Sequence, residues 1–149
     1  MNFVHISIKT FGNGQLEILA KSASFGQDIY VKLTSPKLAD PLLVRTWRPK
    51  FLDTALVSNV INACFPNTIE FNHWIDHSKW AVTKNKHLIC IGDINRQETQ
   101  AKRGGLSLCL TNADASKEFR ELHNRCAANN KNVPPKGICP NPKGAKISP

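Results

Sequence analysis

Residues 76–95, DHSKWAVTKNKHLICIGDIN, contain the features on which the fold and the chemistry of this chain depend. Two apolar runs, Trp80–Val82 and Leu88–Ile91, are separated by a short polar stretch, a pattern typical of a β-hairpin. His77 and Lys79 come just before the first run. In an extended segment side chains alternate between two faces, so residues two apart point the same way. The sequence therefore predicts an imidazole beside an ammonium at the start of a strand.

This pair of side chains suits phosphodiester chemistry. Lys supplies a compact positive charge for phosphate oxygens, and His can attack phosphorus or transfer a proton near neutral pH. An H-x-K tripeptide also arises by chance on solvated strands, so its context decides its meaning. Asp93 and Asn95 follow the second run on a Gly-Asp-x-Asn turn. Such a turn is consistent with ordinary loop structure and with contacts to the imidazole and to phosphate oxygens.

The context resembles a known family. Four separated segments occur in the order and approximate spacing of the C-terminal half of deoxyribonuclease II: Asp76-His77-Ser78-Lys79-Trp80, Cys90-Ile91-Gly92-Asp93-Ile94-Asn95-Arg96, Arg103-Gly104-Gly105 and Leu108-Cys109. Upstream, residues 20–30 and Leu42–Trp47 also resemble that family. The likeness extends over roughly Met1 to Cys126.

The resemblance implies a fold and an activity. Members of the family are built like the phospholipase D group from two similar halves, each of which gives one H-x-K motif to a shared site. They are acid endonucleases that hydrolyse DNA phosphodiesters to 3′-phosphate products without a metal or other cofactor. We therefore expect residues 1–128 to form the C-terminal lobe of such a fold, with the first H-x-K half missing from this chain.

The resemblance also implies roles for individual residues. His77 is the nucleophile or the general acid, and Lys79 is the phosphate anchor. In the family one His forms a covalent phosphohistidine and the His of the other half protonates the leaving 5′-oxygen, which splits one hard displacement into two steps. The need for an imidazolium as acid explains an acid optimum. Asp93 and Asn95 are expected to orient the imidazole.

Charge and close backbone approach suggest the substrate contacts. Basic side chains neutralise DNA phosphates, and glycine lets a backbone approach them closely. The expected contacts are Arg96, Lys102, Arg103 and Gly104. His73 and His77 are four residues apart, but no Glu or Cys at ligand spacing accompanies them, so no metal site is expected.

Two functions remain open from the sequence. The first is an active endonuclease, completed by a second H-x-K lobe from missing sequence or by a symmetric homodimer. The second is a catalytically inactive, truncated DNA-binding remnant or secreted pseudo-enzyme, because loss of one member of a catalytic pair removes most of the rate.

The composition agrees with an anionic partner such as DNA. The 149 residues carry a formal net charge of +9, which favours nucleic acid or a phosphate-rich surface. Residues 129–149 contain four Lys, no acid and five of the nine Pro, so we expect a flexible basic tail. No apolar run is long enough to span a membrane, and the chain begins without a signal peptide. The family resemblance nevertheless implies a lysosomal or secreted protein.

Hydrophobic patterning predicts an α+β fold in which helices pack on a mixed β-sheet. The expected elements are a hairpin over 4–21, a helix over 28–38, a buried strand over 42–47, a helix over 54–63, the hairpin described above, a strand over 106–110 and a closing helix over 114–128, with Asn112 or Asp114 as its cap. Trp47 is expected to lie in the core rather than to stack on a base.

The five cysteines include no C-x-x-C pair, which argues against zinc and against thioredoxin-like chemistry. Cys90 and Cys109 match a disulfide of the resembling family. That bridge closes a loop of about twenty residues, which is worth about 3 kcal/mol in the chain-entropy model. Cys126 also matches a paired position, and Cys64 is a nearby substitute for its usual partner. The alternative is that these cysteines are reduced, buried thiols.

Overall fold

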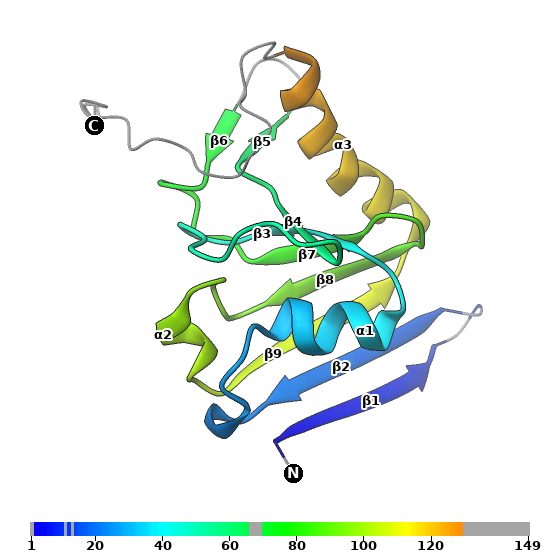
Figure 1. Cartoon of the computed structure of the whole chain (residues 1–149). Helices are drawn as coiled ribbons and strands as arrows, with labels where there is room; N and C mark the ends of the chain where they lie inside the picture. The colour runs from blue at the N-terminus through cyan, green and yellow to red at the C-terminus, as the bar shows by residue number, and fades with distance from the viewer. Residues whose placement is uncertain (1, 11, 13, 66–69, 130–149) are drawn as a thin grey trace.

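A computed structural model describes residues 2–10, 12, 14–65 and 70–129 of the chain. A seven-stranded mixed sheet runs through it in the order β1-β2-β9-β8-β7-β3-β4 (Figure 1). Its strands are β1 (Phe3–Lys9), β2 (Gln15–Lys21), β3 (Leu42–Arg45), β4 (Val57–Asn59), β7 (Trp80–Thr83), β8 (Leu88–Gly92) and β9 (Gly105–Thr111). β3 and β4 are parallel, and the other neighbouring pairs are antiparallel. The predicted α+β class with a mixed sheet is confirmed.

Helices lie on both faces of this sheet (Figure 1). A π-helical turn, η3 (Tyr30–Thr34), continues into α1 (Ser35–Leu38), and its apolar residues join strand residues in the main core. The long helix α3 (Ala113–Asn129) contacts β7 and β8 on the other face. It also contacts β5 (Asn62–Cys64), which forms a small two-stranded sheet with β6 (Glu70–Asn72). No helix among the described residues is long and apolar enough to cross a membrane.

Most predicted elements are confirmed. The first hairpin pairs β1 with β2 from Phe3↔Lys21 to Lys9↔Gln15, although two residues of its turn lie outside the described part. β7, β8 and β9 form where they were expected, as does the helix over 28–38. Asn112 caps α3, because its Oδ1 accepts a hydrogen bond of 2.9 Å from the Ala115 N–H. The predicted tail over 129–149 lies outside the described residues, apart from Asn129 at the end of α3.

The predicted helix over 54–63 is wrong, because this segment contains β4 and most of β5. Its apolar residues recur at spacings that suit a helix as well as buried strands, and short apolar runs cannot be separated by period alone. Side chains hold the extended path. The Thr54 hydroxyl accepts from the Val57 N–H at 3.0 Å, and Asp53 Oδ1 accepts from the Asn59 N–H at 2.8 Å. Such local hydrogen bonds compete with a helix.

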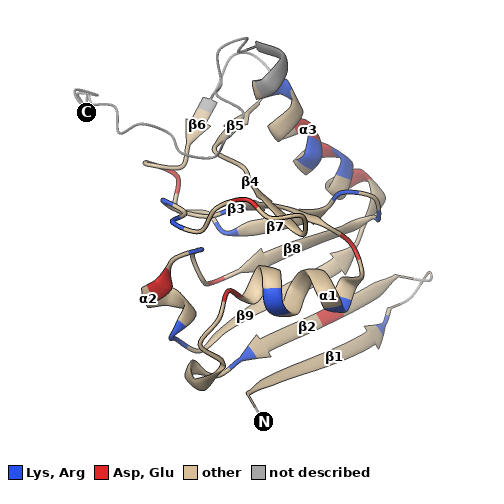
Figure 2. Ribbon diagram, viewed as in Figure 1, with Lys and Arg blue, Asp and Glu red and all other residues tan. Residues whose placement is uncertain are grey.

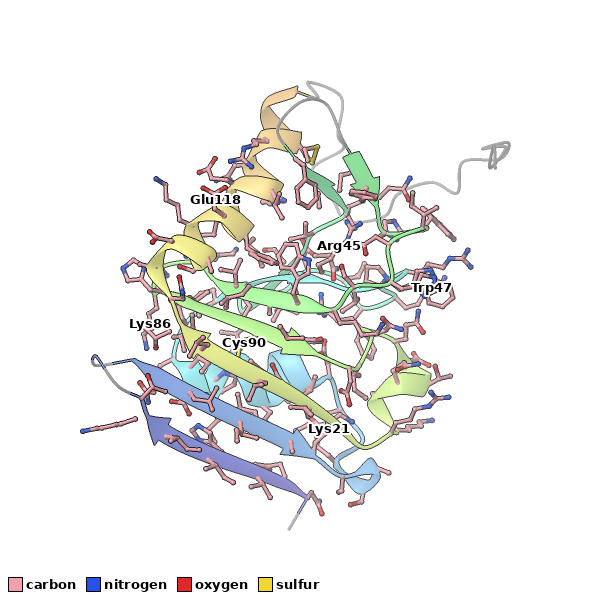
Figure 3. The ribbon with its side chains drawn as sticks, turned by 180° about the vertical axis from the view of Figure 1, so that it is seen from behind. Lys21, Arg45, Trp47, Lys86, Cys90 and Glu118 are labelled. Atoms are coloured by element: carbon pink, nitrogen blue, oxygen red, sulfur yellow. A yellow bond between two sulfur atoms is a disulfide. The ribbon has the colours of Figure 1, made fainter. Side chains whose placement is uncertain are left out.

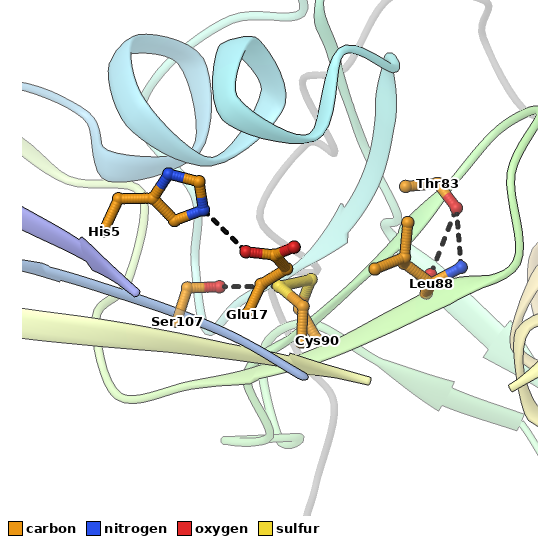
Figure 4. Close-up of a disulfide and its surroundings, with 7 residues drawn as sticks. His5, Glu17, Thr83, Leu88, Cys90 and Ser107 are labelled. Atoms are coloured by element: carbon orange, nitrogen blue, oxygen red, sulfur yellow. Dashed lines mark hydrogen bonds and ion pairs between the residues drawn. A yellow bond between two sulfur atoms is a disulfide. The ribbon is translucent and has the colours of Figure 1, made fainter. Parts of the chain in front are cut away.

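Two disulfides form within the described residues. Cys90 and Cys109 face each other on β8 and β9, as the family resemblance implied. Figure 4 shows this bridge beside Glu17, whose Oε2 lies 2.6 Å from the His5 ring nitrogen. Cys64 and Cys126 join β5 to α3, so Cys64 is the substitute partner that was anticipated.

One face of β1, β2, β9 and β8 is apolar and open. Several large hydrophobic side chains on it are 40–69% exposed: Val4, Ile6, Ile8, Ile91, Leu106, Leu108 and Leu110. In the strand register these positions face one another and alternate with the residues of the opposite face. None of the described strand residues on this face is charged. The predicted site residues lie outside it, before β7 and after β8.

Candidate functional site

The predicted site residues meet at one end of the sheet. Because neighbouring strands are antiparallel, the ends of β2, β3 and β8 lie beside the beginnings of β7 and β9. The segment before β7 and the segment after β8 are directly joined, since the Gly92 N–H donates to the Lys79 carbonyl at 3.0 Å. Figure 3 shows Trp47 and Lys21 at this end and Lys86 at the opposite end. Lys and Arg positions also gather around α2 (Glu98–Ala101), a short unpredicted helix at the same end (Figure 2).

Asp76 fixes the segment that carries the H-x-K motif. One oxygen accepts from the Ser78 N–H at 2.9 Å, and the other accepts from the Ser78 hydroxyl at 2.8 Å and from Arg45 Nε at 2.9 Å. Burial acts to raise the pKa of Asp76, but the Ser78 hydrogen bonds and the Arg45 charge outweigh it and hold that pKa below its ordinary value. An ionised carboxylate therefore sets the path of the chain through the next two residues.

Arg45 is itself fully buried. Besides Asp76, its guanidinium contacts three backbone carbonyls: Val60 and Ile61 accept from Nη1, and Phe71 accepts from Nη2. Figure 3 shows Arg45 inside the molecule and Trp47 at its edge. The guanidinium thus ties the motif to β3 and to the small β5–β6 sheet at once.

His77 and Lys79 are held side by side at the surface. The His77 ring is exposed and stacks on Trp47, with centroids 4.5 Å apart and planes 30° apart. Lys79 Nζ donates to the His77 carbonyl oxygen at 2.7 Å, so its ammonium lies against the backbone of His77. One side of the imidazole is open to solvent, and the Lys79 ammonium is hydrogen-bonded to the backbone of the same residue. This arrangement can receive a phosphodiester.

Asp93 and Asn95 lie close to the motif without a hydrogen bond to the imidazole among those of the described residues. The exposed Asp93 accepts from the Leu106 N–H at 2.8 Å. Its loop folds tightly over Gly105, where a Cβ would lie 2.1 Å from the Ile94 side chain, so only glycine fits. Asn95 is buried, and its Oδ1 accepts from the Trp47 N–H at 3.1 Å. Asn95 therefore acts on the stacking partner of His77.

Arg96 does not lie where a substrate contact requires. It is 1% exposed, and its Nε donates to Asp28 Oδ2 at 2.9 Å. Its other nitrogens donate to the Asn59 side chain and to the Leu52 carbonyl. The expectation that Arg96 binds DNA fails because the guanidinium has no free surface. The residues around Arg96 in the sequence gave no indication that it pairs with Asp28, which is 68 residues away.

The other expected contacts are at the surface. Lys102, Arg103 and Gly104 are exposed after α2. Lys21, which the sequence reasoning did not consider, fixes this loop: its Nζ donates to the carbonyls of Ala101 at 2.7 Å and Arg103 at 2.5 Å. Burial lowers the pKa of Lys21, an effect that the charges of Asp93 and Asp28 oppose. A buried cation thus places two exposed cations.

A group of aromatic and basic side chains beside His77 was also missed. Trp47 is half-buried rather than in the core, and its Nε1 donates to the Trp74 carbonyl at 3.0 Å. The Arg48 guanidinium lies 4.6 Å from the Trp47 ring centroid and 4.5 Å from that of Trp74. The signal in the sequence was position: Trp47 and Arg48 follow the end of β3, at the same edge as the motif.

Comparison with known proteins identifies relatives of the whole described region. The model of the deoxyribonuclease II family matches residues 2–129. Deoxyribonuclease-2 of Caenorhabditis elegans is 33% identical over 132 residues, which cover 82% of this chain and 35% of that protein. Deoxyribonuclease-2-alpha of Rattus norvegicus is 34% identical over 116 residues, 72% of this chain and 33% of that protein. The chain spans about a third of the length of these relatives.

Proposed function

Because the chain belongs to the deoxyribonuclease II family, we propose that it supplies one H-x-K half of an endodeoxyribonuclease. His77 is the nucleophile or the general acid, and Lys79 binds the phosphate. One observation carries the proposal: His77 is exposed beside Lys79 on a segment that the buried Arg45–Asp76 pair holds in place. Residues 1–128 act as the C-terminal lobe of the complete enzyme.

The reaction needs two imidazoles. One attacks phosphorus and forms a phosphohistidine, while the other, as imidazolium, gives its proton to the 5′-oxygen as the P–O5′ bond breaks. Water then attacks the phosphohistidine, frees the His and leaves a 3′-phosphate. Because one His must be protonated, the reaction runs best in acid. The route uses protons and fixed charges and requires no metal.

The second imidazole comes from outside this lobe. His77-Ser78-Lys79 is the single H-x-K sequence among the 149 residues. A second motif is supplied by further sequence of a longer protein or by a second copy of this chain in a symmetric dimer. The two disulfides suit the oxidising, lysosomal or secretory compartment in which we place the protein.

The presence of only one motif also supports a second candidate function, that of a non-catalytic DNA-binding lobe. Lys79, Lys102 and Arg103 lie at the end of the sheet where the motif lies, and the last two are exposed. These cations bind the DNA backbone whether or not a second His is present.

Plasmid nicking by the purified, oxidised chain at about pH 5 with chelator present tests both functions. The matched control for His77→Ala is His87→Ala, because His87 is exposed in the β7–β8 turn. If a second copy of the chain supplies the other motif, we expect nicking by the wild-type chain and by His87→Ala, and loss of nicking in His77→Ala. Equal nicking by all three proteins would refute the role of His77. Salt-sensitive DNA binding without nicking would make the chain a half-site that needs its missing partner, or a lobe that only binds DNA.

A further inference from the structure

Unpaired polar groups gather next to the candidate site. Four buried side-chain nitrogens without a hydrogen-bond partner in the described part of the chain belong to three residues: Arg48 Nε, His73 Nδ1 and Nε2, and Trp74 Nε1. His73 is only 5% exposed. Buried polar groups in native proteins are nearly always hydrogen-bonded, so a cluster of unpaired ones requires an explanation. A ligand that accepts hydrogen bonds is one.

The cluster is continuous with the proposed catalytic imidazole. The Trp47 ring contacts the His77 ring on one hand and the Arg48 guanidinium on the other, at 4.5 Å and 4.6 Å. The same guanidinium lies over Trp74, whose ring centroid is 5.2 Å from that of His73. A single indole ring therefore separates the Arg48 guanidinium from His77.

The backbone of Arg48 is held in a conformation that arginine avoids. Its φ is +44°, in the left-handed region that favours glycine. Two hydrogen bonds keep it there: the Arg48 N–H donates to the His73 carbonyl at 3.1 Å, and Gln97 Nε2 donates to the Arg48 carbonyl at 2.9 Å. Strained residues of this kind gather at ligand sites, because the surrounding structure fixes them for a purpose other than stability.

The chemistry of the cluster fits an anion. Arginine and indole nitrogens only donate hydrogen bonds, and a neutral imidazole can donate one. The nearby carboxylate of Asp76 is already occupied by Arg45 and Ser78. A ligand with several acceptor oxygens and a negative charge satisfies the Arg48 and Trp74 donors and the one N–H of a neutral His73. Phosphate oxygens bind guanidinium groups strongly.

We propose that Arg48, His73 and Trp74 form a second phosphate subsite, which binds a phosphodiester of the DNA strand adjacent to the one that meets His77. The assignment of the ligand rests on the proposed function, since DNA is the polymer in which phosphates follow one another at short spacing. Trp47 forms the wall between the two phosphates. Arg48 thus sets the register of the strand and leaves the chemistry to His77.

Nuclear magnetic resonance of the His77→Ala chain tests the subsite without cleavage. The probe is a thymidine tetranucleotide, and inorganic phosphate is titrated in parallel. The chain has three tryptophans, of which Trp80 lies in the core and is an internal control. We expect the Arg48 Nε–H and the Trp74 indole N–H to shift with the oligonucleotide while the Trp80 indole stays in place. No shift at Arg48 and Trp74 with the oligonucleotide, whether or not inorganic phosphate shifts them, overturns the proposal.

Arg48→Gly is the matching variant, because glycine adopts the left-handed backbone of this position without strain. Its control is Arg125→Ala on α3, a surface position paired with Glu118. For single-stranded DNA we expect the salt slope of log K to fall by about 0.7 in Arg48→Gly and to stay unchanged in Arg125→Ala. An unchanged slope in Arg48→Gly contradicts the subsite. Nicking by His77→Ala equal to that of the wild-type chain, with these shifts intact, would refute only the catalytic proposal.

Discussion

Arg45 and Arg96 are buried to the same extent, and each donates from Nε to an aspartate oxygen at 2.9 Å, yet they anchor different parts of the candidate site. Arg45 holds Asp76, the residue directly before His77. Arg96 holds Asp28, which lies before the helical segment η3, and so fixes the Asp93–Asn95 loop from the other face of the sheet. The site lies between two buried ion pairs that are alike in geometry.

The two ion pairs differ in the other hydrogen bonds that their carboxylates accept. Asp76 is 20% exposed and also binds Ser78 within the motif, whereas Asp28 is 10% exposed and accepts from the Tyr30 N–H at the start of η3. One pair therefore couples the fold to the motif, and the other holds the Asp93–Asn95 loop without contacting the motif. Neither guanidinium is free for DNA. A basic residue near a site is thus not a substrate contact until its partners are known.

The largest expected effect is on stability. Asp28→Ala leaves Arg96 buried without its counter-charge, and we expect it to lower the free energy of unfolding by about 3–5 kcal/mol. Asp76→Ala costs less, about 2 kcal/mol, because water can reach the more exposed end of Arg45. Chemical denaturation of both variants, with the exposed Glu98→Ala as control, measures the order. A larger loss for Asp76→Ala would show that the two pairs do not differ as proposed.

The groups around Arg45 are also expected to make the stability of the chain depend on pH. Burial, followed by the charges of Arg45 and Arg48, lowers the pKa of His73 to about 4. The unfolded chain takes up this proton from about pH 6.5 downward, so stability is full above that pH and is lost as the pH falls toward 4. We expect a loss of about 2–3 kcal/mol over this window. The depressed pKa of Asp76 adds a second loss at lower pH, below about 3.8.

His73→Phe separates the two acid steps. Because phenylalanine carries no titratable group, the variant is expected to lose less stability between about pH 6.5 and 4 than the wild-type chain. A smaller loss remains there, because burial also lowers the pKa of His123. Denaturation curves at a series of pH values check the prediction. An unchanged pH profile in His73→Phe would mean that another group takes up the proton.

The next effect is local. Since Asp76 accepts from the Ser78 N–H, Asp76→Ala is expected to speed hydrogen exchange of the Ser78 amide by about tenfold or more through local opening of the motif. Asp28 does not contact Ser78, so Asp28→Ala is expected to speed hydrogen exchange of the Ser78 amide only as much as that of the β7 amides. Residue-resolved exchange on both variants measures this. Equal selective effects would remove the distinction between the pairs.

The sequence predicted the sheet well because its strands carry clear patterns. Alternation over β1 and β2 and apolar runs over β7 and β8 specify both faces, so the expected hairpins form. It failed over residues 54–63, where the extended path depends on side-chain hydrogen bonds from Asp53 and Thr54. Those contacts leave no period in the sequence. The helix α2 was missed because its four residues are too few to show a helical period.

The site could be predicted only where short sequence motifs specify it. The H-x-K segment, the Asp93 loop and the Cys90–Cys109 bridge meet as expected, since each pairs with its neighbour in the sheet. The partners of Arg96 and the position of Trp47 depend on residues far away in the chain. Burial of a cation is a tertiary property, and charge in the sequence does not distinguish a buried arginine from an exposed one.

The smallest expected effect tests that last distinction directly. Arg103 is exposed, and Lys21 fixes its carbonyl, so Arg103→Ala is expected to reduce the salt slope of double-stranded DNA binding by about 0.9, the value for one phosphate. Arg96→Met keeps the length of the buried side chain and is expected to lower stability while the slope stays the same, because this guanidinium never reaches the surface. Titrations at several salt concentrations, carried out where both variants are folded, give the slopes. If Arg96→Met reduced the salt slope more than Arg103→Ala did, the buried Arg96–Asp28 pair would have to open on binding DNA. The two arginines would then differ in mobility rather than in their partners.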